Sequence, residues 1–120
     1  NDGKLDLIVT HQFSPPTIYK NELTAKRKWI GLSLESRQAI CNRRGVGSKL
    51  KLTTIGPEGK AYKQFREVQT VNGFSAQNDL RVHFGIPEGH IVQDLAVNWC
   101  GKILKKVKNL KINNYNKIVF

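Results

Sequence analysis

The chain has 120 residues, of which 39% are hydrophobic, and its formal net charge is +11 at pH 7. This length provides one domain with a modest core. No apolar run approaches the roughly 20 residues of a membrane-spanning helix, and acids occupy residues 1–9, where a signal peptide has a basic start and an apolar segment.

The charge is distributed unevenly along the chain. Residues 1–24 contain two lysines against three acids and carry −1, so the remainder carries +12. From Gly101 onward there are six lysines and no acid. Such a balance favours anionic partners, namely acidic glycans, nucleic acid or anionic surfaces. A solvated basic surface without a partner is the alternative.

The first 24 residues predict a β-hairpin. Residues 5–10 and 17–22 have the composition of short strands, and Pro15-Pro16 forces an extended connection between them. The open strand edge at residues 5–10 leaves self-association as one possible role. The chain contains no methionine, so we expect Asn1 to follow an upstream segment of a longer protein.

Asp2 and Asp6 have the spacing of the second half of an oxygen-rich calcium loop, in which a glycine such as Gly3 follows the third ligand. Calcium takes six to eight oxygen ligands. The two carboxylates therefore form a calcium site only if residues upstream complete the loop. A turn that leads into a strand needs no metal and is the favoured interpretation, and no other cofactor is predicted.

The rest of the chain predicts a β-rich domain. Short segments with strand-like composition alternate with turn signals, at residues 28–36, 48–55, 60–71, 80–85, 91–99, 103–107 and 117–120. This pattern predicts an all-β fold, an antiparallel β-sandwich or partly open barrel of about seven to nine short strands. Residues 101–110 also have apolar residues at helical spacing, which leaves a helix there as an alternative. Trp29 and Trp99 occupy strand positions typical of core packing.

The segment Asn-Arg-Arg-Gly-Val-Gly at residues 42–47 is a candidate anion-binding loop. Arg43 and Arg44 supply guanidinium groups, and the glycines allow backbone amides to surround an anion. The segment lacks the Lys-Ser/Thr ending of a phosphate-binding loop, so nucleotide hydrolysis is not predicted. Alternatively, the glycines serve only to bend the chain into the following strand.

Asp79, Arg81 and His83 alternate along a predicted strand and are expected on its outer face. An Asp–His pair with an arginine is suited to acid–base chemistry. However, no serine or cysteine is placed as a nucleophile. A surface Arg–Asp pair beside a hydrogen-bonded histidine is therefore favoured over an enzyme. We group Arg81 and His83 with Arg43 and Arg44 as candidate ligand-binding residues.

The two cysteines, Cys41 and Cys100, do not have the spacing of metal ligands, and no histidine is close to them in sequence. A disulfide between them would close a long loop in an extracellular protein. Two buried free thiols are the commoner arrangement. The sequence leaves both arrangements open, and no metal site is predicted.

Several motifs resemble the ASPIC/UnbV domain. They are Trp-Ile-Gly-Leu-Ser-Leu at 29–34, the segment at 42–47, and Gly-Phe-Ser-Ala-Gln-Asn-Asp-Leu-Arg-Val-His-Phe-Gly at 73–85, followed by Leu-Ala-Val-Asn-Trp at 95–99. This resemblance covers residues 28–120. Asn-Asp-Gly-Lys-Leu-Asp-Leu at 1–7 resembles the end of an FG-GAP (VCBS-type) propeller repeat. Together they imply a secreted or cell-surface protein with a calcium-binding propeller upstream, and a β-module without catalytic residues to transfer.

We therefore expect residues 1–24 to be the remnant of an FG-GAP-type repeat and residues 25–120 to be an ASPIC/UnbV-like β domain. The expected function is a non-catalytic extracellular adhesion or interaction module that binds acidic carbohydrate or a protein partner through a basic face. A self-associating cell-surface module is the alternative. Nucleic-acid binding is less favoured because no recognised motif or set of interleaved aromatics is present.

Overall fold

The computed structural model describes residues 2–24, 27–37, 41–101 and 103–120. Asn1, the expected domain boundary at residue 25 and Lys102 lie outside the described residues. Those residues contain nine strands: β1 (Leu7–Val9), β2 (Thr17–Tyr19), β3 (Lys28–Glu35), β4 (Lys49–Ile55), β5 (Ala61–Glu67), β6 (Val82–Ile86), β7 (Ile91–Trp99), β8 (Ile103–Val107) and β9 (Asn114–Val119). No described segment forms a helix of the length and apolar character that crossing a membrane requires.

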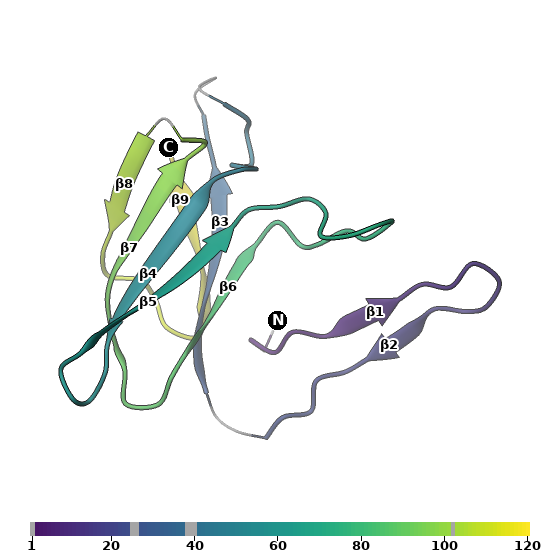
Figure 1. Ribbon diagram of the computed structural model, residues 1–120, viewed down its shortest axis with the longest axis horizontal. Helices are drawn as coiled ribbons and strands as arrows, with labels where there is room; N and C mark the ends of the chain where they lie inside the picture. Colours follow the sequence, from purple (N-terminus) through teal and green to yellow (C-terminus); the bar gives the residue numbers. More distant parts are fainter. Residues whose placement is uncertain (1, 25–26, 38–40, 102) are drawn as a thin grey trace.

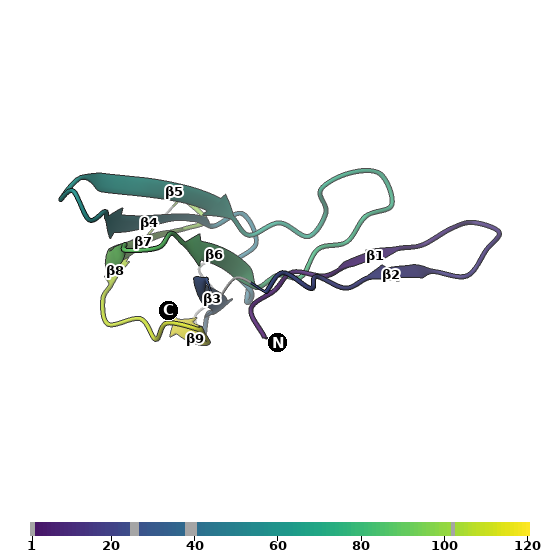
Figure 2. The same ribbon diagram turned by 90° about the horizontal axis from the view of Figure 1, so that it is seen from below.

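Seven of the strands form two facing sheets, with the orders β6-β3-β9 and β5-β4-β7-β8. Figure 2 shows the two sheets as separate layers. The prediction of an all-β sandwich is confirmed. The segment that also fitted a helix forms β8, which pairs antiparallel with β7. Cys100 and Gly101 both have positive φ, 47° and 73°, as a tight turn between antiparallel strands requires.

The core lies between these two sheets. Alternating residues of β3 point inward, and Ile30, Leu32 and Leu34 are all buried, as their spacing predicts. The facing sheet contributes the buried side chains of Leu50, Leu52, Leu95, Val97 and Trp99. The predicted core position of Trp99 is confirmed, since this side chain is fully buried.

One pairing departs from the antiparallel pattern. β9 runs parallel to β3, so that Leu34 lies opposite Ile118. The two strands come from opposite ends of the domain, and no local turn fixes their register. Their pairing depends on the assembled core, so alternation within either strand does not reveal its direction.

The strands β1 and β2 form a separate two-stranded antiparallel sheet. We call residues 5–23 the arm and residues 27–120 the body. Figure 1 shows that the arm projects away from the body on the same side as the loop that precedes β6. The arm has seven large apolar side chains that are more than half exposed: Leu5, Leu7, Ile8, Phe13, Ile18, Tyr19 and Leu23.

The start of the chain contacts the body through Trp29. This side chain is buried, but it lies outside the cluster that fills the core between the sheets, because it occupies the outer face of β3. The indole stacks on His83 and meets the edge of Tyr115, with ring centroids 5.5 and 5.1 Å away. Gly3 lies over the indole with φ +86°, and a Cβ there would overlap Trp29.

Candidate functional site

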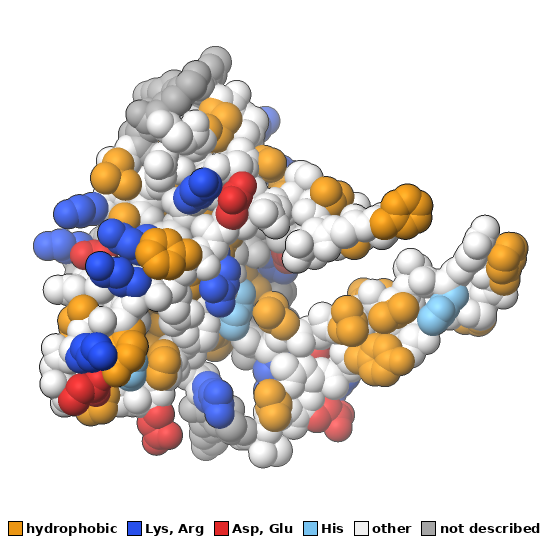
Figure 3. All heavy atoms as spheres, in the orientation of Figure 1, with side chains coloured by type: hydrophobic (Ala, Val, Ile, Leu, Met, Phe, Trp, Pro, Cys, Tyr) orange, Lys and Arg blue, Asp and Glu red, His pale blue; other side chains and the backbone are white. Residues whose placement is uncertain are grey.

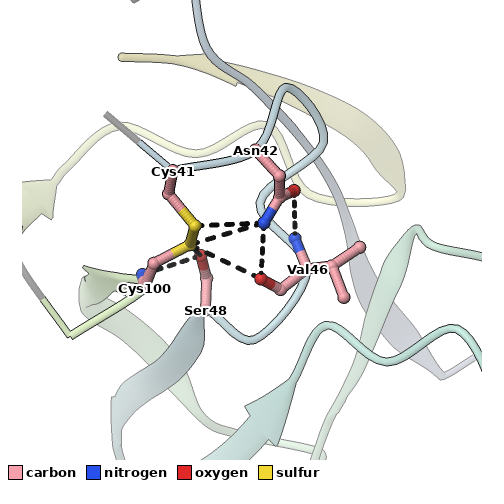
Figure 4. Close-up of a disulfide and its surroundings, with 5 residues drawn as sticks. All are labelled: Cys41, Asn42, Val46, Ser48 and Cys100. Atoms are coloured by element: carbon pink, nitrogen blue, oxygen red, sulfur yellow. Dashed lines mark hydrogen bonds between the residues drawn. A yellow bond between two sulfur atoms is a disulfide. The ribbon is translucent and has the colours of Figure 1, made fainter. Parts of the chain in front are cut away.

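The segment at 42–47 is joined to the end of β7 by a disulfide between Cys41 and Cys100, with a Cα–Cα distance of 6.4 Å (Figure 4). Of the two arrangements that the sequence left open, the structure has the disulfide. The Asn42 side chain closes the segment on itself. Its Nδ2 donates to the Val46 carbonyl at 2.8 Å, and its Oδ1 accepts from the Val46 amide at 2.8 Å.

The backbone amides of residues 45–48 all donate within the chain. Gly45 donates to Asn42 O, Val46 to Asn42 Oδ1, Gly47 to Val68 O and Ser48 to Gly45 O. These amides are therefore not available to an anion, and anion binding by the rest of the segment, with Arg43 and Arg44, stays a prediction. Gly45 and Gly47 instead have φ of +68° and +82° and form the sharp bend that leads to β4.

Three of the four predicted ligand-binding residues line one open hollow of about 670 Å³. Arg43 and Arg44 come from the disulfide-held segment, and Arg81 comes from the residues just before β6. We call this site the arginine hollow. Its lining also includes Ser33, Leu34, Glu35, Gln77, Asn78, Asp79 and Leu80.

The charges in the arginine hollow are largely compensated. Arg81 binds Asp79 through Nη2 and Nε, at 2.5 and 2.7 Å from Oδ2, and its guanidinium lies 4.3 Å from the centre of the Tyr115 ring. The side-chain hydrogen bond from Arg81 is the main cause that lowers the pKa of Asp79. This pair leaves Arg43 and Arg44 as the cations that an incoming anion meets.

Arg43 is itself partly engaged, since its Nη2 lies 3.9 Å from Glu35 Oε1. Glu35 also forms an ion pair with Lys117. The hydrogen bond from Lys117 is the first cause of the lowered pKa of Glu35, and the charge of Arg43 adds to it. Among the described residues, only Arg44 of the three arginines in the hollow forms no ion pair or hydrogen bond.

His83 lies elsewhere. It stacks on Trp29, its Nε2 lies 2.9 Å from Gly3 O, and it lines a different hollow, between the arm and the body. The predicted convergence of Asp79, Arg81 and His83 on one strand face is wrong, because β6 begins only at Val82. Asp79 and Arg81 belong to the turn before the strand, where the carboxylate also accepts the Arg81 amide.

The two carboxylates of the possible calcium loop bind backbone amides. Asp2 Oδ1 accepts from the Lys4 amide at 3.0 Å, and Asp6 Oδ1 accepts from the Asn21 amide at 2.9 Å. Asp6 therefore ties the two strands of the arm together. Within the described ranges, no group of three His, Cys, Asp or Glu side chains is placed to hold a metal ion.

A second candidate site, which sequence reasoning did not locate, lies on the outer face of the four-stranded sheet. The strand register places one row of side chains across this face, one from each strand. In strand order, the row consists of Phe65 on β5, Lys51 on β4, Ala96 on β7 and Lys106 on β8. Because side chains two residues apart share a face, Lys63, Lys49 and Leu104 belong to the same face. So do two acids: Glu67, which lies opposite Lys49, and Asp94, which lies opposite Thr53. We call this face the lysine surface: Lys49, Lys51, Lys63, Phe65, Ala96, Leu104 and Lys106. Figure 3 shows Lys and Arg side chains gathered over these strands beside apolar ones.

The lysine surface combines an excess of cations with exposed apolar groups. None of its four lysines forms an ion pair with any described residue. The side chains of Phe65 and Leu104 are 65% and 67% exposed. Together with Lys51, Ala96 and Lys106, they line a shallow hollow of about 430 Å³. Glu67 also lines this hollow, so the site offers several cations, one carboxylate and an apolar contact.

The geometry defines the class of this protein as a disulfide-bonded β-sandwich domain with a projecting hairpin. The family model described as ASPIC and UnbV matches residues 38–119, and the chain belongs to that family. Among curated proteins and among solved structures, no match was found.

Proposed function

We propose that the domain is a non-catalytic extracellular binding module that holds an acidic polysaccharide on the lysine surface. The observation that carries this proposal is the placement of four lysines, none of them in an ion pair with a described residue, on one sheet face that has two acids, Glu67 and Asp94. The lysines are Lys49, Lys51, Lys63 and Lys106. Solvated cations of this kind attract a polyanion at long range and bind it in a salt-dependent way.

The apolar part of the surface favours a polysaccharide over other anions. A sugar ring has an apolar C–H face, which fits against the exposed ring of Phe65, while its carboxylate or sulfate groups reach Lys51 and Lys106. Single-stranded nucleic acid favours successive aromatic platforms for its bases. The lysine surface has one aromatic ring, which supports a sugar polymer as the ligand.

The disulfide between Cys41 and Cys100 supports an extracellular location, because disulfides persist in oxidising compartments and are rare in reducing ones. The arginine hollow is a secondary contact in this proposal. Arg44, which has no ion pair among the described residues, provides its cation, and Arg43 assists. Ligand binding by Arg43, Arg44, Arg81 and His83 thus stays a prediction.

We also infer that residues 1–24 are the end of an FG-GAP-type repeat. Two features support this assignment: the segment Asn-Asp-Gly-Lys-Leu-Asp-Leu at residues 1–7, and the antiparallel pairing of β1 with β2. In such a repeat, Asp2 and Asp6 act as calcium ligands only when residues upstream complete the loop.

The polysaccharide proposal is tested by binding of dextran sulfate and polygalacturonate, with uncharged dextran as the control ligand. The variant Lys51→Gln/Lys106→Gln removes two cations that lie on either side of Ala96. We expect roughly 5- to 30-fold weaker binding, because an exposed ion contact contributes up to about 1 kcal/mol. The matched variant Lys20→Gln/Lys111→Gln removes the same charge elsewhere and should bind almost as the unmodified chain does. Equal weakening by both variants would refute a site on the lysine surface.

A further inference from the structure

One edge of β3 has a gap in its strand pairing, and the arginine hollow lies over this gap. β3 pairs with β6 only as far as Leu32, which lies opposite Val82, although β3 itself continues. Further along the same edge, the Ser36 amide donates to the Arg43 carbonyl at 2.9 Å. Leu34 lies between these two contacts. It has no strand partner on this edge, and it lines the hollow.

The main-chain amide and carbonyl of Leu34 point to this edge. Backbone groups two residues apart in a strand point to the same side, and the Ser36 amide marks that side. The Glu35 carbonyl points to the opposite edge, where it accepts the Phe120 amide at 3.0 Å. No described residue pairs with Leu34 on the side of the hollow. Because Leu34 is only 6% exposed and buried main-chain groups normally have a partner, the gap offers one donor and one acceptor to a bound molecule.

The side chains around the gap add further polar groups that have no partner among the described residues. They are the hydroxyl of Ser33, the guanidinium of Arg44 and the side-chain amides of Gln77 and Asn78. The hydroxyl and the two amides can each both donate and accept a hydrogen bond. Arg43 supplies a second cation, which it shares with Glu35. The hollow thus combines cations with neutral groups that need both donors and acceptors from a ligand.

This combination selects among anions. Inorganic phosphate and sulfate mainly accept hydrogen bonds, so they leave the Leu34 carbonyl without a donor, and they also meet the carboxylates of Glu35 and Asp79. A sugar acid has a carboxylate for the arginines and several hydroxyl groups that both donate and accept. The volume of about 670 Å³ lies in the range of small-molecule sites. A ligand of this class therefore fits the hollow better than a simple anion or a neutral sugar does.

We propose that the arginine hollow binds a single acidic sugar unit. Its carboxylate meets Arg44 and Arg43, and its hydroxyl groups bond to the Leu34 main chain and to the amides of Gln77 and Asn78. This inference rests on the proposed function for the class of ligand and deepens it. The lysine surface holds a polyanion by charge, whereas the hollow selects one sugar unit by hydrogen bonds.

Titration of the unmodified chain with galacturonate, followed by NMR amide spectra, tests the inference. We expect the signals of the Leu34 amide and of the Gln77 and Asn78 side chains to shift. The dissociation constant should be on the order of 1 mM, as for a ligand of this small size. Galactose lacks the carboxylate, and inorganic phosphate lacks the hydroxyl groups. Each should bind at least about fivefold more weakly.

Two variants separate the charge of the hollow from its hydrogen bonds. Arg44→Gln should weaken galacturonate binding roughly fivefold, because it removes the cation that has no other partner. Arg27→Gln removes an exposed arginine elsewhere and should bind galacturonate as the unmodified chain does. Asn78→Ala keeps the charge and should weaken galacturonate binding about threefold while leaving phosphate binding unchanged.

The lysine surface supplies the comparison that keeps the two proposals distinct. Lys51→Gln/Lys106→Gln should weaken dextran sulfate binding and leave the galacturonate shift at Leu34 unchanged. If dextran sulfate binds as proposed but galacturonate shifts no signal in the hollow, this inference fails and the proposed function stands. A shift of the Lys51 amide without one at Leu34 would place the sugar on the lysine surface and overturn the inference. Equal affinity for phosphate and galacturonate would also overturn it.

Discussion

The body and the arm contain the same kind of strand with opposite surroundings. Ile30 on β3 is fully buried, whereas Ile18 on β2 is 69% exposed. Both occur in short segments with strand-like composition, and both are paired in sheets. Strand composition thus predicts the backbone conformation in both regions, whereas burial depends on whether a second sheet packs against the first.

The two regions also differ in what holds them together. The body has a core between two sheets and a disulfide that joins residues 59 positions apart. The arm is held by its strand pairing and by the hydrogen bond that the Asn21 amide donates to Asp6. Gly3, just before the arm, packs against Trp29 of the body. We therefore expect changes in the body to alter global stability and changes in the arm to alter local structure.

Loss of the disulfide should give the largest effect. The variant Cys41→Ser/Cys100→Ser should lower the free energy of unfolding by roughly 4 kcal/mol, the chain-entropy value for a loop of this length. Urea unfolding measures the loss. Reduction of the unmodified chain should reproduce it. A loss below about 1 kcal/mol would show that the sheets fix the segment at residues 42–47 without the bond.

The contact between the arm and the body should be sensitive to Gly3. In Gly3→Ala, a methyl group overlaps the Trp29 indole at a φ that costs about 1–2 kcal/mol for an L-residue. We expect the start of the chain to leave Trp29, which red-shifts its fluorescence. Gly85→Ala is the control, because open space surrounds its Cβ position and its φ is not positive. An equal shift in both variants would contradict this contact.

The pair of Asp79 and Arg81 should give a smaller, pH-dependent effect. The folded-state pKa of Asp79 is lowered, so its ionised form stabilises the fold above its unfolded pKa of about 3.9. That stability is lost as pH falls through the lower folded-state value. Both side chains are partly exposed, so we expect Asp79→Asn to cost less than about 1 kcal/mol at pH 7.

The cost of Asp79→Asn should vanish in acid, where Asp79 is protonated in both states. Urea unfolding of the variant and the unmodified chain across a pH series measures this convergence. If the difference in the free energy of unfolding between Asp79→Asn and the unmodified chain stays constant down to strong acid, the ion pair does not cause that difference.

The smallest effect is expected on the arm. Ile18→Ala removes an exposed side chain and should change the free energy of unfolding of the body by no more than about 0.5 kcal/mol, measured at low protein concentration to avoid association. If Ile18→Ala lowers the free energy of unfolding of the body by more than about 2 kcal/mol, the arm and the body unfold as one unit.

Local pattern was sufficient for much of the fold. The inward positions of Ile30, Leu32 and Leu34 follow directly from alternation, and the turn at Gly56–Gly59 follows from its glycines and proline. The parallel pairing of β3 with β9 does not follow from either strand. Trp29 is buried as an apolar strand residue should be, but it lies outside the core, where His83, Tyr115 and, from outside the sandwich, Gly3 contact it.

The sites were harder to predict, because they combine residues from several strands. Alternation within one strand places Lys49 and Lys51 on its outer side, but their alignment with Lys63 and Lys106 requires the register of β4, β5, β7 and β8. Conversely, the spacing of Arg81 and His83 indicated one face. The late start of β6 placed Arg81 against Tyr115, which lies far away in sequence.

The proposed role of the lysine surface is tested most directly by the salt dependence of dextran sulfate binding. For the unmodified chain, affinity should fall steeply as salt rises, because bound polyanion is held by cations in water. For Lys51→Gln/Lys106→Gln, the plot of log Kd against log salt concentration should be clearly shallower, since fewer cations contribute. Parallel plots for the two proteins, or an affinity of the unmodified chain that does not respond to salt, would contradict the account.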